Sequence, residues 1–222
     1  TIGWLIEEPL RIHHAGKSRE ERQKRVLEML QVVGMDESYL SKFPGELSGG
    51  QRQRVAIAIA LILNPEFVVC DEAVSALDVS VQAQVLNLLK TLQEKFSLTY
   101  LFISHNLNVV SYMSDRIGIM YLGEIVELGG VEEISQNPQH PYGRALFSAS
   151  LGIGKNQGER IVLKGDLPSP ANPPAGCPFH TRCFMAEEKC RSQKPVLKDL
   201  GKGHYCACHL VQKRMEEEKS VK

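Results

Sequence analysis

Apolar residues are distributed along the chain in two different patterns, which predict alternating helices and strands. Residues 19–33 and 79–96 carry apolar side chains three and four positions apart, the pattern of a helix with one buried face. Short continuous apolar runs at 67–70 and 98–104 predict buried strands instead. Strands that alternate with helices predict an α/β fold, with a parallel sheet covered by helices on both faces.

The ends of the predicted elements carry capping residues and prolines. Ser18, with Glu21 three residues later, is expected to cap the first helix. Another helix follows the loop "FPGELSGGQRQR" and is expected to end before Asn64-Pro65. The other expected elements are two shorter strands and a short helix, in the segments "RIGIMY", "IVELG" and "PYGRALFSAS".

The amino-acid composition is that of an ordinary globular protein, and it bears on whether nucleic acid or a membrane is an expected partner. Of the 222 residues, 43% are hydrophobic and 23% are charged. The 26 Lys and Arg balance the 26 Asp and Glu, so no basic excess points to nucleic acid. The longest apolar run, Val55 to Leu63, is too short to span a bilayer, which needs about 20 residues. Because no signal-peptide pattern is present, we expect a cytosolic chain that can still dock on a membrane protein.

An acidic pair follows the first predicted strand. Asp71 can hold Mg²⁺ beside the phosphates of a nucleotide, and Glu72 can polarise the attacking water as a general base. Taken alone, the pair is equally consistent with a surface turn after any strand. The segment "SALD", Ser75 to Asp78, comes just after it. His105 follows the second strand, where it can contact a γ-phosphate or simply cap the next helix.

The loop "LSGGQRQR", Leu47 to Arg54, has the features of an anion site. Its glycines, Gly49 and Gly50, let a backbone approach phosphates closely. The amides and the dipole at the start of the following helix favour an anion, and Ser48 can donate its hydroxyl to a phosphate oxygen. A lone Ser-Gly-Gly is also what an ordinary glycine-rich turn with a serine cap contains.

Along the chain the order is "LSGGQ", then a strand with Asp71-Glu72, then "SALD", then a strand with His105. In this order the four motifs resemble the ATP-binding cassette ATPases. Four ordered matches multiply their odds, which makes chance agreement a poor explanation. The resemblance extends almost from end to end. Four longer segments are similar to the oligopeptide and dipeptide importer branch of that family: "DEAVSALDVSVQAQVLNLL", "SDRIGIMYLGEIVELG", "NPQHPYGRALFSA" and "PSPANPPAGCPFHTRC".

The resemblance implies a role for each motif. The signature loop of the family would consist of Leu47, Ser48, Gly49, Gly50 and Gln51. Asp71 would be the Walker B aspartate that holds Mg²⁺, and Glu72 would be the catalytic glutamate. Ser75 to Asp78 would form the D-loop, and His105 would be the switch histidine.

The sequence departs from the family at single positions and by one larger absence. Ala73 replaces the usual proline and Asn106 the usual aspartate, and neither change removes a ligand of the nucleotide. The P-loop, G-x-x-x-x-G-K-[ST], and the Q-loop precede the region equivalent to "IEEPLRIH" in the family, and neither is found in this sequence. The segment "AGKSRE" ends like a P-loop, but Arg11 stands where the first glycine belongs.

That absence changes what the chain is expected to do. The chain opens on "TIGWLIEEPL" without methionine, so we expect its beginning to be missing. In the family, the signature loop of one subunit acts on ATP held by the P-loop of another. This chain is therefore expected to complete a partner's site and not to hold ATP alone. Apolar faces that would pack on the missing strands are expected to be exposed.

The resemblance also implies a fold and a division into domains. The expected fold is a partial RecA-like nucleotide-binding domain with a helical subdomain and a small Cys-rich C-terminal module. Four prolines within "LPSPANPPAG" indicate a stiff linker before that module. The expected divisions are a helical subdomain with the signature loop at 1–60, the RecA-like core at 61–150, the linker at 151–176 and the Cys-rich region at 177–222.

The implied function is that of the ATP-hydrolysing subunit of a peptide importer. Its cofactors would be ATP and Mg²⁺, and its partners a second ATP-binding cassette subunit and transmembrane permease subunits, with no nucleic acid. It would lie in the cytoplasm, on the inner face of the cell membrane. Three alternatives remain: a non-catalytic half-module that completes a partner's site, a cassette ATPase that acts on DNA or ribosomes, and a metal or redox module. The second would need a basic groove or a coiled-coil insertion, and the sequence has neither.

Five of the six cysteines lie between Cys177 and Cys208, which in a cytosolic protein argues for metal or redox chemistry. The gaps of five, six and seventeen residues match structural zinc only loosely. The resemblance implies a [4Fe-4S] cluster, which we favour over zinc, and free thiols remain open. The expected cluster ligands are Cys177, Cys183, Cys190 and Cys208. Cys70, in a predicted strand, is expected to belong to the core.

Overall fold

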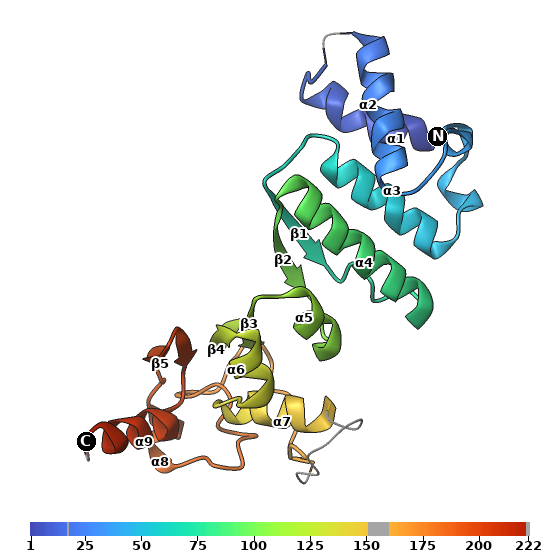
Figure 1. Cartoon of the computed structure of the whole chain (residues 1–222). Coiled ribbons are helices and arrows are strands. Elements are labelled where there is room, and N and C mark those ends of the chain that lie inside the picture. Colours follow the sequence, from blue (N-terminus) through green and yellow to red (C-terminus); the bar gives the residue numbers. More distant parts are fainter. Residues whose placement is uncertain (17, 151–159, 221–222) are drawn as a thin grey trace. The chain divides into compact units, whose positions relative to one another are not determined.

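The computed structural model describes residues 1–16, 18–150 and 160–220, and Figure 1 shows the course of the chain. The chain forms two compact units, Thr1–His105 and Asn106–Lys222. Lys17 of the "AGKSRE" segment and residues 151–159 of the predicted linker lie outside the described residues. No helix in the described ranges is both long enough and apolar enough to cross a membrane.

The first unit begins with a group of helices that packs on α1 (Ile2–Ile12), an element that the sequence patterns did not predict. Ile2, Ile6 and Leu10 follow one another at four-residue spacing and form its buried stripe. Pro9 lies inside this helix and made the segment look irregular. The elements that contact α1 are α2 (Arg19–Val32), α3 (Gly49–Leu61) and the short 3₁₀ helix η1 (Glu37–Ser41).

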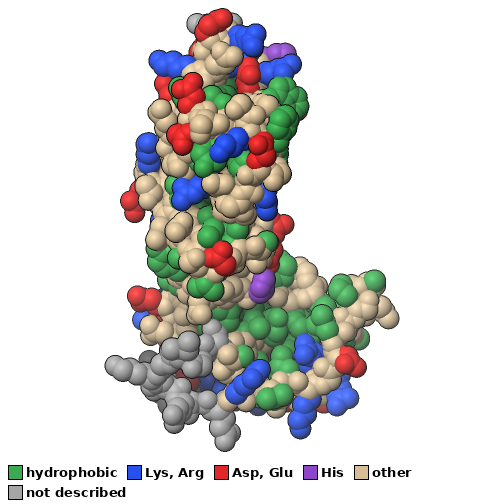
Figure 2. Space-filling model, turned by 90° about the vertical axis from the view of Figure 1, so that its right-hand side faces the viewer, with side chains coloured by type: hydrophobic (Ala, Val, Ile, Leu, Met, Phe, Trp, Pro, Cys, Tyr) green, Lys and Arg blue, Asp and Glu red, His purple; other side chains and the backbone are tan. Residues whose placement is uncertain are grey.

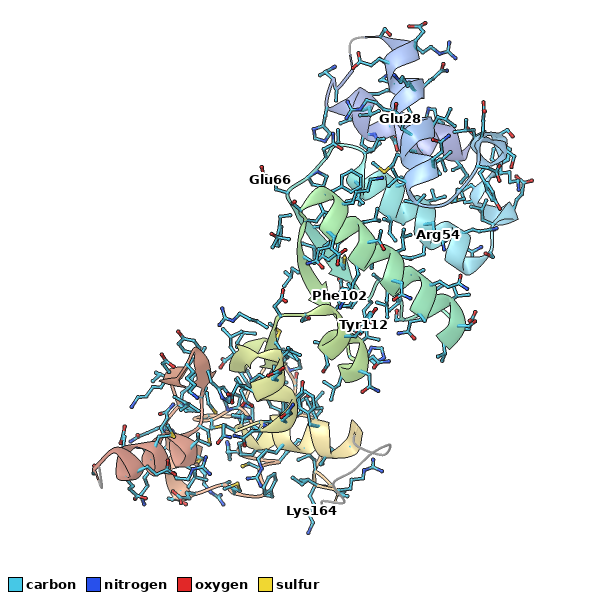
Figure 3. The ribbon with its side chains drawn as sticks, in the orientation of Figure 1. Glu28, Arg54, Glu66, Phe102, Tyr112 and Lys164 are labelled. Carbon is cyan, nitrogen blue, oxygen red and sulfur yellow. The ribbon has the colours of Figure 1, made fainter. Side chains whose placement is uncertain are left out.

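The predicted ends of α2 are confirmed. Ser18 caps the helix, since its Oγ accepts a hydrogen bond from the Glu21 N–H at 3.2 Å. Gly34 takes φ +73° just beyond the other end, a conformation that glycine adopts without strain. Arg54 of α3, labelled in Figure 3, donates a hydrogen bond to the Val33 carbonyl at 2.6 Å. This bond gives a partner to a backbone carbonyl at the C-terminal end of α2. The second 3₁₀ helix, η2 (Pro44–Glu46), leads into α3.

Two parallel strands complete the first unit. β1 (Phe67–Asp71) pairs with β2 (Thr99–Ile103), and α4 (Val79–Phe96) connects them, at the residues that the apolar periodicity predicted. Cys70 is buried as expected, and the Tyr100 hydroxyl donates to the Leu89 carbonyl of α4 at 3.0 Å. The parallel pair and its helices confirm the α/β class.

Within the described residues of this unit, one face of the parallel pair carries exposed apolar side chains. Phe67, Val69, Leu101 and Ile103 alternate along the two strands on the face away from Cys70 and Tyr100, and each is 45–55% exposed. Side chains alternate between the faces of a strand, so α3 and α4 bury only one set. The exposed set agrees with the expectation that apolar faces would lie open.

The second unit holds an antiparallel sheet that the sequence patterns foresaw only in part. The predicted hairpin joins β3 (Arg116–Tyr121) to β4 (Glu124–Gly130) through Leu122 and Gly123, both with positive φ. β5 (Lys198–Gly201) and β6 (His204–Cys206) were missed, because each is too short to show a pattern. The four strands have the order β3-β4-β6-β5.

Helices cover this sheet and line its core. A cluster of nine buried side chains includes Tyr121 and Phe179, whose rings meet edge-on with centroids 5.1 Å apart. The predicted short helix at "PYGRALFSAS" is confirmed as Pro141–Ser150. The helices of the unit are α5 (Leu107–Met113), α6 (Val131–Gln136), α7 (Pro141–Ser150), α8 (Glu188–Ser192) and α9 (His209–Ser220).

A buried carboxylate ties the sheet of the second unit to the start of α7. Glu127 of β4 has no exposed surface, and it accepts hydrogen bonds from the backbone N–H groups of Gln139 at 2.6 Å and His140 at 3.0 Å. Its Oε1 also lies 2.8 Å from Nε2 of His204 on β6. Burial raises the pKa of Glu127, whereas these hydrogen bonds lower it. The carboxylate thus joins three segments that are distant in sequence.

His140 is expected to make the second unit sensitive to acid. Burial lowers its pKa from 6.5 to about 4, and its Nδ1 accepts the Tyr142 N–H at 3.1 Å, which a proton on that nitrogen would prevent. The unfolded chain binds the proton below about pH 6.5 but the folded one only below about 4. As the pH falls from about 6.5 to about 4, the free energy of unfolding should therefore decrease by about 3 kcal/mol.

Urea denaturation of the second unit between pH 4 and 7, followed by hydrogen exchange, measures this effect. Glu127, whose raised pKa acts in the opposite direction, is present in every sample, so we compare the wild type with His140→Asn. Asparagine keeps an acceptor and does not titrate. Equal pH slopes in the two proteins would refute the assignment to His140.

Candidate functional site

The carboxyl ends of β1 and β2 bring the acidic pair and the histidine of the sequence analysis together. Asp71 is the exposed last residue of β1, and Glu72 follows it. The Glu72 N–H donates to the Ile103 carbonyl at 3.0 Å, which ties the two strand ends to each other. Nδ1 of His105 lies 3.0 Å from Oε1 of Glu72. Parallel strands place their carboxyl ends at one edge, where open α/β sheets bind ligands.

Glu72 has an unusual backbone and a stabilised charge. Its φ is +50°, a region that residues other than glycine seldom occupy and that often marks functional sites. A proline at position 73 would restrict this residue to extended backbone, and Ala73 does not. The hydrogen bond to His105 is the main reason that the pKa of Glu72 is lowered, so the carboxylate is ionised at neutral pH.

The predicted D-loop residues hold the turn that follows. Ser75 Oγ donates to the Glu72 carbonyl at 3.0 Å. Asp78 caps α4, because its Oδ1 accepts from the Val81 N–H at 3.0 Å and from the Ser80 hydroxyl at 2.6 Å. These bonds, led by the one from Ser80, lower the pKa of Asp78. In this structure the Asp78 carboxylate is therefore a helix cap.

The glycine-rich loop forms the N-terminus of α3. Ser48 caps the helix through a capping box with Gln51, whose N–H donates to Ser48 Oγ at 3.3 Å. Leu47 is buried, and its carbonyl accepts a hydrogen bond from Arg52 at 2.5 Å. A hydroxyl that accepts one hydrogen bond still has its own hydrogen to donate. Ser48 is exposed, so the arrangement suits a phosphate at the start of a thirteen-residue helix.

The two glycines of this loop pack closely against the D-loop and α4, a contact that sequence reasoning missed. A Cβ on Gly50 would lie 2.5 Å from Cγ1 of Val81, and one on Gly49 would lie 3.3 Å from Cδ2 of Leu77. Gly50 therefore has no room for a side chain at this contact, and Gly49 has little. No local pattern could have revealed it, since the partners lie about thirty residues away.

The cysteines of the second unit gather, but not in a metal-binding arrangement. The Cys177 N–H donates to the Cys190 carbonyl at 2.8 Å, and both side chains belong to one buried cluster that Cys183 contacts. Cys208 lies in a separate cluster with Cys206. Within the described residues, no group of three or more His, Cys, Asp or Glu side chains is placed to hold a metal ion.

The charge state of these thiols has a physical cause. Burial is the main reason that the pKa values of Cys177, Cys183 and Cys208 are raised, that of Cys183 to about 11. Charge repulsion from neighbouring cysteines adds to each shift. All six cysteines are free. The predicted cluster thus finds no support in the arrangement of the described residues.

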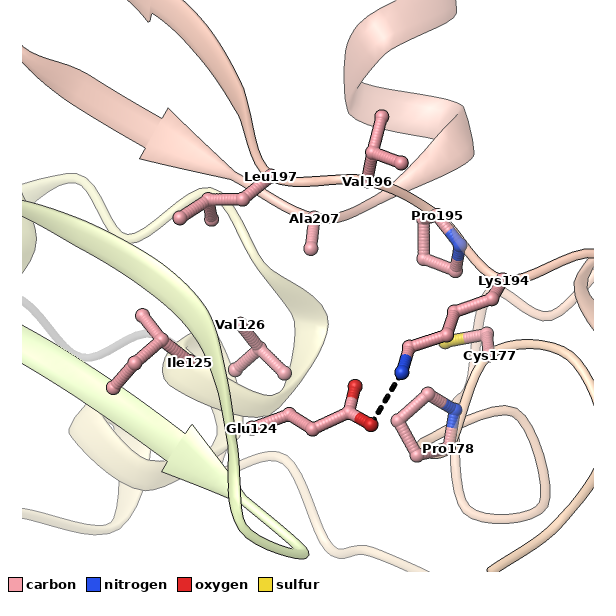
Figure 4. A pocket seen from close by; sticks show the side chains of 10 residues that line it. All are labelled: Glu124, Ile125, Val126, Cys177, Pro178, Lys194, Pro195, Val196, Leu197 and Ala207. Atoms are coloured by element: carbon pink, nitrogen blue, oxygen red, sulfur yellow. Dashed lines mark hydrogen bonds and ion pairs between the residues drawn. The ribbon is translucent and has the colours of Figure 1, made fainter.

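A cavity of about 300 Å³ lies next to Cys177 (Figure 4). Its walls are mainly apolar, and Lys194 and Glu124 form an ion pair of 2.5 Å at one side. Pro178, Pro195 and the strand residues Ile125 and Val126 line the remainder. None of the phosphate-directed residues belongs to this cavity.

Comparison with known proteins identifies the family. The family described as "ABC transporter" matches residues 3–75, and the "Oligopeptide/dipeptide transporter, C-terminal region" matches residues 126–190. The chain is 36% identical to the ATP-binding cassette MJ0796, solved as a dimer bound to ADP and Pi, with a TM-score of 0.52. That match covers 59% of this chain and 56% of the other.

Relatives with curated names extend the match. The oligopeptide transport ATP-binding protein AppF of Bacillus subtilis is 54% identical over 95% of this chain and 64% of its own length. The putative oligopeptide transport ATP-binding protein YkfD of the same species is 48% identical over 99% and 68%. The dipeptide transport ATP-binding protein DppF of Haemophilus influenzae is 50% identical over 93% and 63%. The sequence thus spans about two thirds of the length of these relatives. The chain belongs to the ATP-binding cassette family, among the ATP-binding proteins of oligopeptide and dipeptide transport.

Proposed function

We propose that this chain is the ATP-hydrolysing subunit of a peptide importer and that its signature loop completes an ATP site held by a second subunit. The observation that carries the proposal is the exposed Ser48 at the N-terminus of α3. Beside it, Gly49 packs on Leu77 of the D-loop and Gly50 packs on Val81 of α4. The names of AppF and DppF support oligopeptides or dipeptides as the transported class. Permease subunits and the inner face of the membrane follow from the same family assignment.

The residues at the strand ends fit Mg²⁺ and ATP. Asp71 offers an exposed carboxylate to hold Mg²⁺, which would neutralise charge on the phosphates when bound. Glu72, ionised through its contact with His105, would accept a proton from the attacking water. His105 would orient that carboxylate. Both would act on a nucleotide that a P-loop holds beside them.

A test uses the complex that copurifies with the tagged chain from the membranes of its own host. Ser48→Ala should lower its ATP hydrolysis about tenfold to a hundredfold, the value of one hydrogen bond to a charged phosphate. Ser41→Ala is the matched control, since the Ser41 hydroxyl makes only a long bond of 3.5 Å to the Ser38 carbonyl. Full activity of Ser48→Ala in a working complex would contradict the proposal.

The alternatives are separated by simple measurements. ATP hydrolysis by the purified chain alone would exclude a non-catalytic half-module. A function on DNA or ribosomes finds no support on the face drawn in Figure 2, where basic and acidic side chains of the described residues are interspersed. A metal module finds support only in the mutual proximity of the thiols, and iron and zinc analysis of anaerobically purified protein decides between cluster, zinc and free thiols.

A further inference from the structure

Tyr39 contacts the signature loop from a separate segment. The hydroxyl of Tyr39, on η1, accepts a hydrogen bond from Nε2 of Gln51 at 2.9 Å. Both side chains are half-buried, so water competes less with this bond than on an open surface. The bond joins the segment that follows α2 to the first turn of α3.

Gln51, which is bound to Tyr39, also forms two hydrogen bonds with Ser48. Its Oε1 accepts a hydrogen bond from the Ser48 N–H at 2.9 Å, while its own N–H donates to Ser48 Oγ. A reversed amide would point its NH₂ group at the Ser48 N–H, where no acceptor exists. With Tyr39 at one end and Ser48 at the other, the Gln51 side chain is held in one orientation. Without Tyr39, its free rotamers would compete with the capping geometry.

Tyr39 is itself held in place from two sides. The ammonium of Lys42 lies 4.1 Å from the centre of the Tyr39 ring, a cation–π contact. Asp36 caps η1 by accepting the Ser38 N–H at 2.8 Å. The Ile2 N–H donates to the Lys42 carbonyl at 2.9 Å, which fastens this segment to α1. Tyr39 is therefore presented to Gln51 by a packed support.

We propose that Tyr39 is a positioning residue that sets the rate of ATP hydrolysis by fixing Ser48 through Gln51. This inference rests on the proposed function, in which Ser48 meets a phosphate held by another subunit. Because that other subunit holds the nucleotide, Tyr39 should affect turnover and not the apparent affinity for ATP. Tyr39→Phe removes only the hydroxyl and keeps the ring on which Lys42 packs.

The first measurement uses the isolated full chain. In Tyr39→Phe, exchange of the Ser48 amide hydrogen should become about five- to tenfold faster, as expected for loss of one hydrogen bond. The urea midpoint reported by Trp4, the single tryptophan, should stay unchanged. In a Gln51→Ala background the same substitution should add nothing, because the two residues act in series. Unchanged Ser48 exchange, or additive effects, would overturn the inference.

The second measurement uses the copurified complex. Tyr39→Phe should lower kcat about five- to tenfold and leave the KM for ATP within about twofold of the wild type. Faster Ser48 exchange with an unaltered kcat would also overturn the inference. A wild-type complex without ATP hydrolysis would count against the proposed function instead, and the exchange experiment would still decide whether Tyr39 holds the loop.

Discussion

Gly50→Ala is expected to lower ATP hydrolysis by the copurified complex about a hundredfold to a thousandfold. The new Cβ would lie 2.5 Å from Cγ1 of Val81, far inside contact distance. A valine in a helix has one strongly preferred rotamer, so the glycine loop and not Val81 has to move. That movement would displace the Ser48 hydroxyl and the helix amides together, which costs more than losing one donor. Overpacking should also reduce stability by about 1–3 kcal/mol.

A second substitution and a control make this result specific. Val81→Ala removes the clashing methyl groups and leaves only its Cβ, 3.8 Å from the new side chain, so the double variant should recover most of the activity. Gly45→Ala is the matched control, because a Cβ there meets nothing within 4 Å. If Gly50→Ala is fully active, or if Val81→Ala brings no recovery, the loop does not depend on this contact.

Glu127→Leu is expected to lower the free energy of unfolding of the second unit by about 3–5 kcal/mol. The carboxylate is fully buried and accepts three hydrogen bonds, two from backbone N–H groups and one from His204. Leucine fills similar space but leaves all three donors without this acceptor, and two of them are buried. Loss of this anchor should loosen the start of α7 and the pairing of β4 with β6.

Urea denaturation followed by hydrogen exchange of peptides from β3, β4 and β6 measures the loss. Trp4 fluorescence reports the first unit and should not change. Glu133→Gln is the control, since Glu133 approaches His204 only to 4.0 Å and is half-exposed, so its loss should cost less than about 1 kcal/mol. Equal effects of the two variants would show that Glu127 is no anchor.

The cysteine segment shows what sequence spacing leaves undecided. Five of the six cysteines lie between Cys177 and Cys208, and the structure places them in or against two buried clusters. Spacing alone carried no information on burial, and burial decides whether a thiol keeps its proton. The structure places Cys177 and Cys190 among the core side chains around Phe179, in no arrangement that holds a metal within the described residues.

Features that depend on neighbours within a few residues could be read directly from the amino-acid order. The caps at Ser18 and Ser48 and the helix at 79–96 are of this kind, because capping and helical periodicity act over three or four positions. The order of the motifs likewise indicated the family.

Contacts between segments that are distant in sequence are visible only in the tertiary structure. Glu72 meets His105 across 33 positions and Glu127 meets His204 across 77, and neither pair leaves a mark in a local pattern. The approach of Gly50 to Val81 is of the same kind. Such contacts depend on how helices and strands pack once the chain has closed its loops, and packing is a property of the whole fold.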